Sequence, residues 1–283
     1  MDKRIVALRI GMSKFCIVGM SILFIILILS IFAPVISRFD PNAISLTDRL
    51  LRPEWFSRGF NGHILGTDEL GRDIFTRLLF GARVSIFIAI VSCSVAITLG
   101  AFLGLVAGYF GKLIDDVIMR CMEVLSSIPD IVLAICILSL FGPSVPNLII
   151  ILILSRLPFF CRMARNNVLS IVNVEFVKAS KSMGAGRFHI MVRQILPNIT
   201  TPLLVALSQA LGATIIMEAG LSFLGVGIQQ PQPSWGNMIA AGRGFLATHP
   251  WVCFAPGIAL MLVVISFNFL GDGFRDVFDP KRT

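Results

Sequence analysis

The sequence predicts an all-α membrane protein with six transmembrane helices. Of its 283 residues, 56% are hydrophobic and only 14% are charged, and the mean hydropathy is +0.87. Soluble domains carry about 25% charged residues, so a chain of this composition would expose a large apolar surface in water. Apolar segments long enough to cross a bilayer as helices recur along the chain. The composition argues against a soluble enzyme, a disordered chain and a secreted disulfide scaffold.

The chain begins with a basic segment that is followed by a long apolar one. Residues 1–14 carry four basic residues, and residues 15–36 contain no charge. The apolar run is too long for the hydrophobic region of a signal peptide, and no small-residue cleavage site follows it. We expect residues 1–14 to be a cytoplasmic segment, residues 15–36 to be the first transmembrane helix and residues 37–83 to be an extracytoplasmic loop.

The other five spans are predicted within residues 84–273. The second span, Val84–Phe110, is uncharged, and its glycines at four-residue spacing form a small-residue face suited to close helix packing: Gly100, Gly104 and Gly108. The remaining expected spans are Val124–Phe141, Val145–Met163, Leu203–Leu224 and Trp251–Leu270, the last ended by Gly271 and Gly273. Residues 274–283 are expected to form a cytoplasmic tail.

The distribution of basic residues predicts the orientation. Six spans place both termini on one side of the membrane. With the termini inside, the inner segments carry fifteen Lys and Arg residues and the outer segments carry eight. Cytoplasmic loops are enriched in these residues, so both termini are predicted to be cytoplasmic. The net charge of +8 is therefore attributed to membrane topology, and no nucleic-acid partner is expected.

The sequence gives no reason to assign a catalytic residue or a metal site. The six cysteines lie in or beside apolar runs without a CxxC pair, and the three histidines are far apart. No GxxxxGK[ST] phosphate loop occurs, so the chain is not expected to bind or hydrolyse ATP. We expect a non-catalytic membrane subunit without a bound cofactor.

The loop at residues 175–197 is the most informative cytoplasmic segment. Apolar residues before Gly184 are spaced as in a short amphipathic helix, Gly184 and Gly186 permit a sharp turn, and Pro197 is expected to start the next span. Such a helical loop either seats in a groove of a partner protein or lies on the lipid headgroups. The residues alone leave both interpretations open.

This loop resembles the EAA loop of ABC importer permeases. Lys178, Ala179 and Ser180 stand at the position of the Glu-Ala-Ala triad, and Gly184, Leu196 and Pro197 fall at the family spacing. Two residues depart from the pattern, because Lys178 replaces the usual Glu and Gln194 replaces the usual Ile.

Three further segments extend the resemblance over nearly the whole chain. Residues 65–77 (LGTDELGRDIFTR) resemble the LGTDxxGRDxxSR segment of dipeptide, oligopeptide and nickel permeases. Residues 218–227 with 233–238, and residues 267–280, resemble the fifth-helix exit and the carboxyl end of the same subfamily. The chain is thus similar to the permease subunit of these importers that is called C.

The resemblance implies the type I ABC importer permease fold and a set of partners. Such a chain forms half of a heterodimeric pore in a bacterial inner membrane, with a B-type permease, two nucleotide-binding subunits that use ATP and Mg, and an extracytoplasmic solute-binding protein. Its EAA loop couples the pore to the ATPase, which points to Lys178, Ala179, Ser180, Gly184, Ala185, Leu196 and Pro197. The implied substrates are di- and oligopeptides, with nickel, metal chelates or glutathione as alternatives.

Three charged residues inside predicted spans are candidates for the translocation pathway: Arg156, Asp130 and Glu218. A charge at the centre of a bilayer costs about 2.5–3.5 kcal/mol on insertion scales, so it normally faces a cavity or a partner. Arg156 either meets a substrate carboxylate or carbonyl, or pairs with Asp130 or the other permease. A structural or gating role is favoured for Glu218. A relay through the three charges would instead suit an ion-driven secondary transporter or channel.

The outer segments contain a further group of charged residues. Asp68 is expected to cap a helix that starts near Glu69, with Arg72 and Asp73 fixing the loop through ion pairs. The alternative is that these residues contact the solute-binding protein. The stretch that ends at Trp235 is rich in Gln and Pro and is a second candidate for that contact or for a gate.

Overall fold

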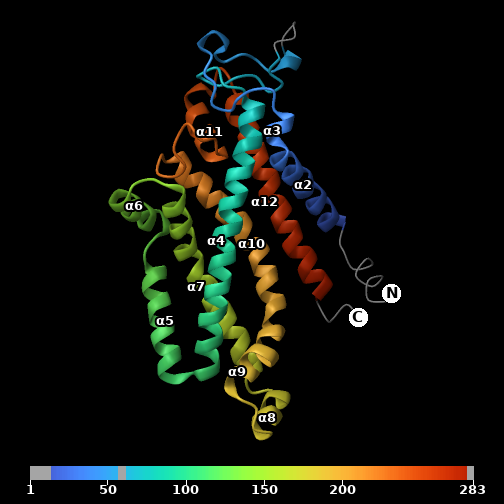
Figure 1. Cartoon of the computed structure of the whole chain (residues 1–283), viewed down its shortest axis with the longest axis vertical. Coiled ribbons are helices and arrows are strands. Elements are labelled where there is room, and N and C mark those ends of the chain that lie inside the picture. The colour runs from blue at the N-terminus through green and yellow to red at the C-terminus, as the bar shows by residue number, and fades with distance from the viewer. Residues whose placement is uncertain (1–13, 57–61, 279–283) are drawn as a thin grey trace.

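The computed structural model describes residues 14–56 and 62–278, which form an elongated helical bundle (Figure 1). Helices at least 18 residues long and apolar enough to cross a membrane are α2 (Lys14–Ile31), α4 (Ile74–Phe110), α7 (Val145–Ile171), α10 (Leu196–Phe223, continuous with the residues from Arg187) and α12 (Trp251–Phe278). A bent pair, α5 (Lys112–Ser127) and α6 (Asp130–Phe141), supplies the sixth span. The predicted all-α, six-span architecture is confirmed.

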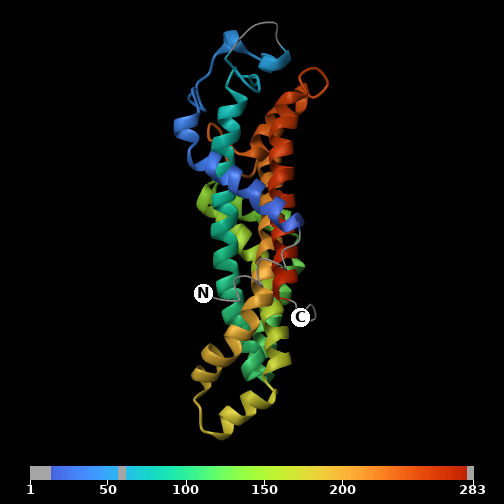
Figure 2. The same ribbon diagram turned by 90° about the vertical axis from the view of Figure 1, so that its right-hand side faces the viewer.

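Shorter elements occupy the two ends of the bundle. The end that carries residues 37–73 holds α3 (Ala33–Ile36), η1 (Leu46–Asp48), η2 (Glu54–Phe56), α11 (Trp235–Gly242) and η4 (Arg243–Phe245). The opposite end holds α8 (Glu175–Ser182), α9 (Arg187–His189) and the π-helical turn η3 (Ile190–Ile195). Figure 2 shows that these two groups of elements lie at opposite ends of the long helices. We refer to them as the α3 end and the α8 end.

Four helices extend beyond their predicted limits, among them α7, which continues past Met163 to Ile171. The helix predicted from Val84 already begins at Ile74, because Asp73 caps it through a 2.7 Å hydrogen bond from the Thr76 amide to its Oδ2. α10 begins at Leu196, where Pro197 suits the first turn. α12 passes through Gly271 and Gly273 instead of ending there.

Gly273 has a packing role rather than a terminating one. A Cβ atom at this position would collide with the Cys16 side chain of α2. The contact places the start of the first described helix beside the last turns of α12. A missing side chain therefore permits helix–helix contact here, and the helix continues to Phe278.

The third span differs most from its prediction. A single helix over Val124–Phe141 was expected, yet the chain bends by 84° between α5 and α6. Pro129 lacks an amide hydrogen and disfavours helical geometry at the preceding residue, and Ile128 is accordingly extended (φ −90°, ψ 122°). The break turns Asp130 into the first residue of a helix that lies across the bundle, between its two ends (Figure 1).

The glycine face of α4 forms a close contact with α7. A Cβ on Gly100 would come within 2.7 Å of the Phe160 Cβ, and one on Gly108 within 2.8 Å of the Val168 Cβ. At Gly104, a Cβ would collide with the Cys161 carbonyl oxygen and lie 2.7 Å from the Ala164 Cβ. The predicted small-residue face is confirmed, and it packs against α7.

Replacing Gly104 by Ala should therefore destabilise the assembled protein. The added methyl group forces α4 and α7 apart, and overpacking of this kind costs about 1–3 kcal/mol. We expect a lower thermal midpoint for the detergent-solubilised complex. Gly257→Ala is the matched control, because no atom lies within 4 Å of a Cβ at that helical position. Equal midpoints for the two variants would contradict the packing assignment.

Candidate functional site

The loop at residues 175–197 forms two helical pieces separated by a turn. α8 ends at Ser182 with Met183 as its C-cap, and Gly184 adopts φ +82°, a left-handed conformation that favours glycine. Val177 of α8 is fully buried against the α7–α10 side of the bundle. The predicted helix–glycine–helix arrangement is confirmed, and the loop projects from the α8 end of the bundle (Figure 2).

Large apolar side chains remain exposed at the tip of this loop. Met183 is 80% exposed and Phe188 is 79% exposed, whereas Ile190 and Ile195 are buried in the bundle. Lys178 and Ala179 are exposed, and Ser180 is buried. One face of the loop thus packs against the bundle. The apolar tip remains exposed, and a partner protein or a lipid surface can cover it.

Two residues that depart from the EAA pattern contact each other. The Gln194 side-chain amide donates a 2.6 Å hydrogen bond to Ser180 Oγ, which joins α8 to the π-helical turn. Ser180 replaces the second Ala of the triad and Gln194 replaces the usual Ile. The polar pair therefore links the two helical pieces where the family pattern has apolar residues.

The loop also contacts the end of α4. The Lys181 Nζ lies 5.3 Å from the centre of the Tyr109 ring, and the Arg187 Cζ lies 6.0 Å from the centre of the Phe110 ring. Cation–π contacts at exposed sites contribute about 0.5–1 kcal/mol each. These two contacts hold both helical pieces of the loop against the end of α4.

At the α3 end, Asp68 organises a buried network. Its Oδ1 accepts hydrogen bonds from the Leu70 and Arg72 amides at 2.9 and 3.0 Å, and its Oδ2 accepts one from Arg72 Nε at 2.7 Å. The Arg77 guanidinium approaches the same oxygen at 3.6 Å. The expectation that Asp68 caps a helix near Glu69 is wrong, because Asp73 is the cap and Asp68 closes the turn before it.

The network joins distant parts of the chain. Arg72 Nη1 donates to Gln230 Oε1 at 2.9 Å, and Arg77 Nη1 donates to the Pro41 carbonyl at 2.7 Å. The Trp235 indole donates to the Leu78 carbonyl at 3.1 Å, and Trp235 is only 1% exposed. Sequence reasoning did not single out Arg77 or Gln230, whose roles depend on contacts across more than 150 residues.

Burial decides how these residues can act. Asp68, Arg72, Asp73 and Trp235 are all buried within this chain. Their side chains hold the loop at residues 37–73 against α4 and α11, as the ion-pair interpretation predicts. Any direct contact with a solute-binding protein would therefore have to be made by other residues, which are exposed at the α3 end.

Glu218 of α10 is fully buried at the same end. The Ser222 hydroxyl donates a 2.8 Å hydrogen bond to its Oε1 and accepts one from the Ile228 amide at 3.1 Å. Ser85 of α4 and Ser234, the N-cap of α11, are the other hydroxyls near the carboxyl group. This position joins three elements and supports a structural or gating role rather than an open pathway lining.

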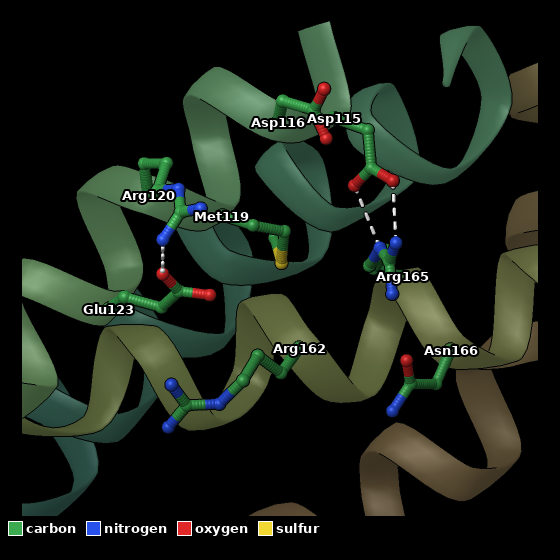
Figure 3. Close-up of a pocket in the computed structure, with 8 residues that line it drawn as sticks. All are labelled: Asp115, Asp116, Met119, Arg120, Glu123, Arg162, Arg165 and Asn166. Atoms are coloured by element: carbon green, nitrogen blue, oxygen red, sulfur yellow. Dashed lines mark hydrogen bonds and ion pairs between the residues drawn. The ribbon is translucent and has the colours of Figure 1, made fainter. Parts of the chain in front are cut away.

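A polar pocket of about 320 Å³ lies between α5 and α7 (Figure 3). The Arg165 guanidinium contacts both oxygens of Asp115, at 2.7 and 2.5 Å, which ties α5 to α7. Arg120 and Glu123 form an ion pair at 3.0 Å, and both are exposed. Across residues 14–56 and 62–278, no three His, Cys, Asp or Glu residues are grouped to hold a metal ion.

The described residues form a helical bundle with five helices that are long and apolar enough to cross a membrane, or six spans when the bent pair is counted as one, and an exposed helical loop lies at one end. The profile described as "Binding-protein-dependent transport system inner membrane component" matches residues 100–283. The profile "N-terminal TM domain of oligopeptide transport permease C" matches residues 5–53. The chain therefore belongs to the family of binding-protein-dependent transport system inner membrane components.

Curated relatives match most of the chain. The probable D,D-dipeptide transport system permease protein DdpC of Escherichia coli is 40% identical over 260 residues, which cover 92% of this chain and 85% of the relative. The dipeptide transport system permease protein DppC of Alkalihalophilus pseudofirmus is 38% identical, with 95% and 86% covered. The glutathione transport system permease protein GsiD of Pectobacterium atrosepticum is 40% identical, with 78% and 73% covered.

Solved structures confirm the fold class. A chain of the inward-facing MetNI methionine ABC transporter superposes with a TM-score of 0.60 at 21% identity. The match covers 72% of this chain and 97% of that one. The fold is that of type I ABC importer permeases.

Replacing Asp68 by Asn should unfold the α3 end. The change removes the negative charge that faces two buried guanidinium groups, and breaking a buried pair in this way costs about 3–5 kcal/mol. We expect a lower thermal midpoint and faster trypsin cleavage within the loop at residues 37–73. Glu123→Gln is the control, because it breaks an exposed ion pair worth about 0–1 kcal/mol. If both variants behaved alike, the network would not hold the loop.

Proposed function

We propose that this chain is the permease subunit through which a bacterial ABC importer moves di- and oligopeptides across the inner membrane. The observation that carries the proposal is the similarity to dipeptide permeases, which reaches 40% identity over 92% of the chain. A glutathione permease matches a smaller share of the chain, so glutathione is the second candidate. Nickel has weaker support, because none of the relatives described above is a nickel permease.

The proposed assembly contains partners that do the chemistry. A second, B-type permease completes the pore, two nucleotide-binding subunits hydrolyse ATP with Mg, and an extracytoplasmic solute-binding protein delivers the peptide. This chain binds no cofactor and supplies no catalytic group. Both termini are cytoplasmic in this proposal, in agreement with the excess of basic residues on that side.

The loop at residues 175–197 is proposed to be the coupling element. Exposed Lys178, Ala179 and the apolar tip would contact a nucleotide-binding subunit. The conformation of the loop would be held by Ser180, Gly184, Ala185, Leu196 and Pro197. Because Lys181 and Arg187 stack on the last aromatic residues of α4, displacement of the loop would be passed to α4 and to the bend that follows at Gly111.

Gly184→Ala and Gly186→Ala form a matched test of this proposal. Both positions have open space around a Cβ atom, but Gly184 has φ +82° and Gly186 has φ −63°. Left-handed geometry costs a non-glycine residue about 1–2 kcal/mol, which corresponds to about a 5- to 30-fold loss of the native loop conformation. We expect Gly184→Ala to lower uptake of radiolabelled dialanine by a factor in this range, and Gly186→Ala to leave it unchanged.

The measurement uses cells that lack the chromosomal copy and carry the wild type or a variant. Wild-type protein should restore dialanine uptake, and membrane levels of the chain should be equal among the variants. Absence of dialanine uptake with the wild type would contradict the peptide substrate. Full uptake with Gly184→Ala would contradict the coupling role of the loop.

A further inference from the structure

The break between α5 and α6 leaves a carboxylate without a partner at the edge of a pocket. Asp130 is exposed and makes no side-chain hydrogen bond or ion pair within the described part of the chain. It is the first residue of α6, where the helix amides favour a negative charge. It lines a pocket of about 560 Å³ between α6 and α10 whose other walls are largely apolar, among them Ile131, Met217 and Leu221.

A cation lies near the same pocket, in the direction of the α8 end. Arg156 Nε donates a 3.1 Å hydrogen bond to Thr214 Oγ1, one turn of α10 before Met217. The neighbouring Ser155 hydroxyl contacts Met217 Sδ at 3.5 Å, which brings this part of α7 to the pocket wall. The two terminal nitrogens of the Arg156 guanidinium have no partner among residues 14–56 and 62–278.

These two charges do not neutralise each other in this chain. The expectation that Arg156 pairs with Asp130 is not met, because the side chain of Arg156 is bonded to Thr214. Each charge costs about 2.5–3.5 kcal/mol when it is placed in the middle of a bilayer without compensation. The cost falls when the group faces water or a ligand of opposite charge. Asp130 lines the pocket directly, and Arg156 adjoins its wall through the contacts of Thr214 and Ser155.

The chemistry of the two poles identifies the ligand. A guanidinium fixed through Nε presents its two Nη groups as a fork that matches a carboxylate. A single unpaired carboxylate next to an apolar wall suits an ammonium group. A dipeptide carries both charges, separated by at most about 7 Å of extended backbone.

We propose that Asp130 and Arg156 are the two poles of a binding site for a zwitterionic peptide in transit. Asp130 receives the α-ammonium group, Arg156 receives the α-carboxylate, and the apolar pocket between α6 and α10 receives a side chain. The site rests on the proposed function and names the part of the peptide that the pore recognises. Since every unmodified dipeptide shares the two terminal charges, the site accepts many side chains.

The test uses the complete importer in proteoliposomes with its binding protein. The probe is radiolabelled alanyl-photoleucine, whose diazirine reacts with adjacent side chains on illumination. In the wild type we expect uptake of the probe and adducts on residues 131–133 and 216–221. Asp130→Asn and Arg156→Gln should each reduce both adduct yield and uptake at least tenfold, whereas Asp130→Glu and Arg156→Lys should retain most of both.

Matched controls distinguish the loss of this site from a general effect of removing a charged side chain. Asp116→Asn and Arg162→Gln change an acid and a base in the polar pocket between α5 and α7, and both should leave adduct yield unchanged. Unchanged adducts in Asp130→Asn and Arg156→Gln would overturn the site. A variant that fails to co-purify with the second permease would also overturn it, in favour of a structural pair between subunits. If the wild type took up dialanine but formed no adduct in the pocket, the site would fail while the proposed function stood.

Discussion

Charges that are removed from water, inside the protein or inside a bilayer, must be paired, hydrated or held by a ligand, and this constraint organises the protein. At the α3 end, Asp68 is enclosed by two guanidinium groups, and the resulting network fixes the outer loop on α4. Between α5 and α7, Asp115 and Arg165 satisfy each other. Asp130 and Arg156 meet no opposite charge in the described parts of the chain, and Glu218, which also meets none, is held by a hydroxyl group instead. The structure therefore separates charges that hold helices together from charges that remain available to a solute.

The same architecture connects the two ends of the molecule. α4 runs from the buried network at Asp73 to the aromatic pair that contacts the loop at residues 175–197. Its glycine face lies directly on α7, the helix that carries Arg156. A displacement of the loop would thus be transmitted through closely packed helices to Arg156, one of the two charged residues of the proposed peptide site. This is the physical route by which ATP hydrolysis in a partner would alter access to the pocket.

Much of this arrangement could be predicted from the residues, and the failures have physical causes. Hydropathy found the spans, and the Gly100–Gly104–Gly108 spacing predicted the close contact with α7. The helix start at Ile74 was missed, because Asp68 and Asp73 are both competent caps and only tertiary contacts decide between them. The 84° angle between α5 and α6 could not be predicted, since Pro129 marks a break without giving its angle. Arg77 and Gln230 were missed because their partners are remote in sequence.

The loop at residues 175–197 is proposed to dock on an ATPase. The most direct test places the photoreactive residue p-benzoylphenylalanine at Phe188, which is 79% exposed, in membranes of the native cells. We expect a crosslink to a protein that contains a phosphate-loop ATPase domain, and none to such a protein when the same residue replaces Phe102, an exposed residue of α4 outside the loop. Crosslinks to lipid alone from Phe188, with uptake that persists after ATP depletion, would contradict the account and favour an ion-driven transporter.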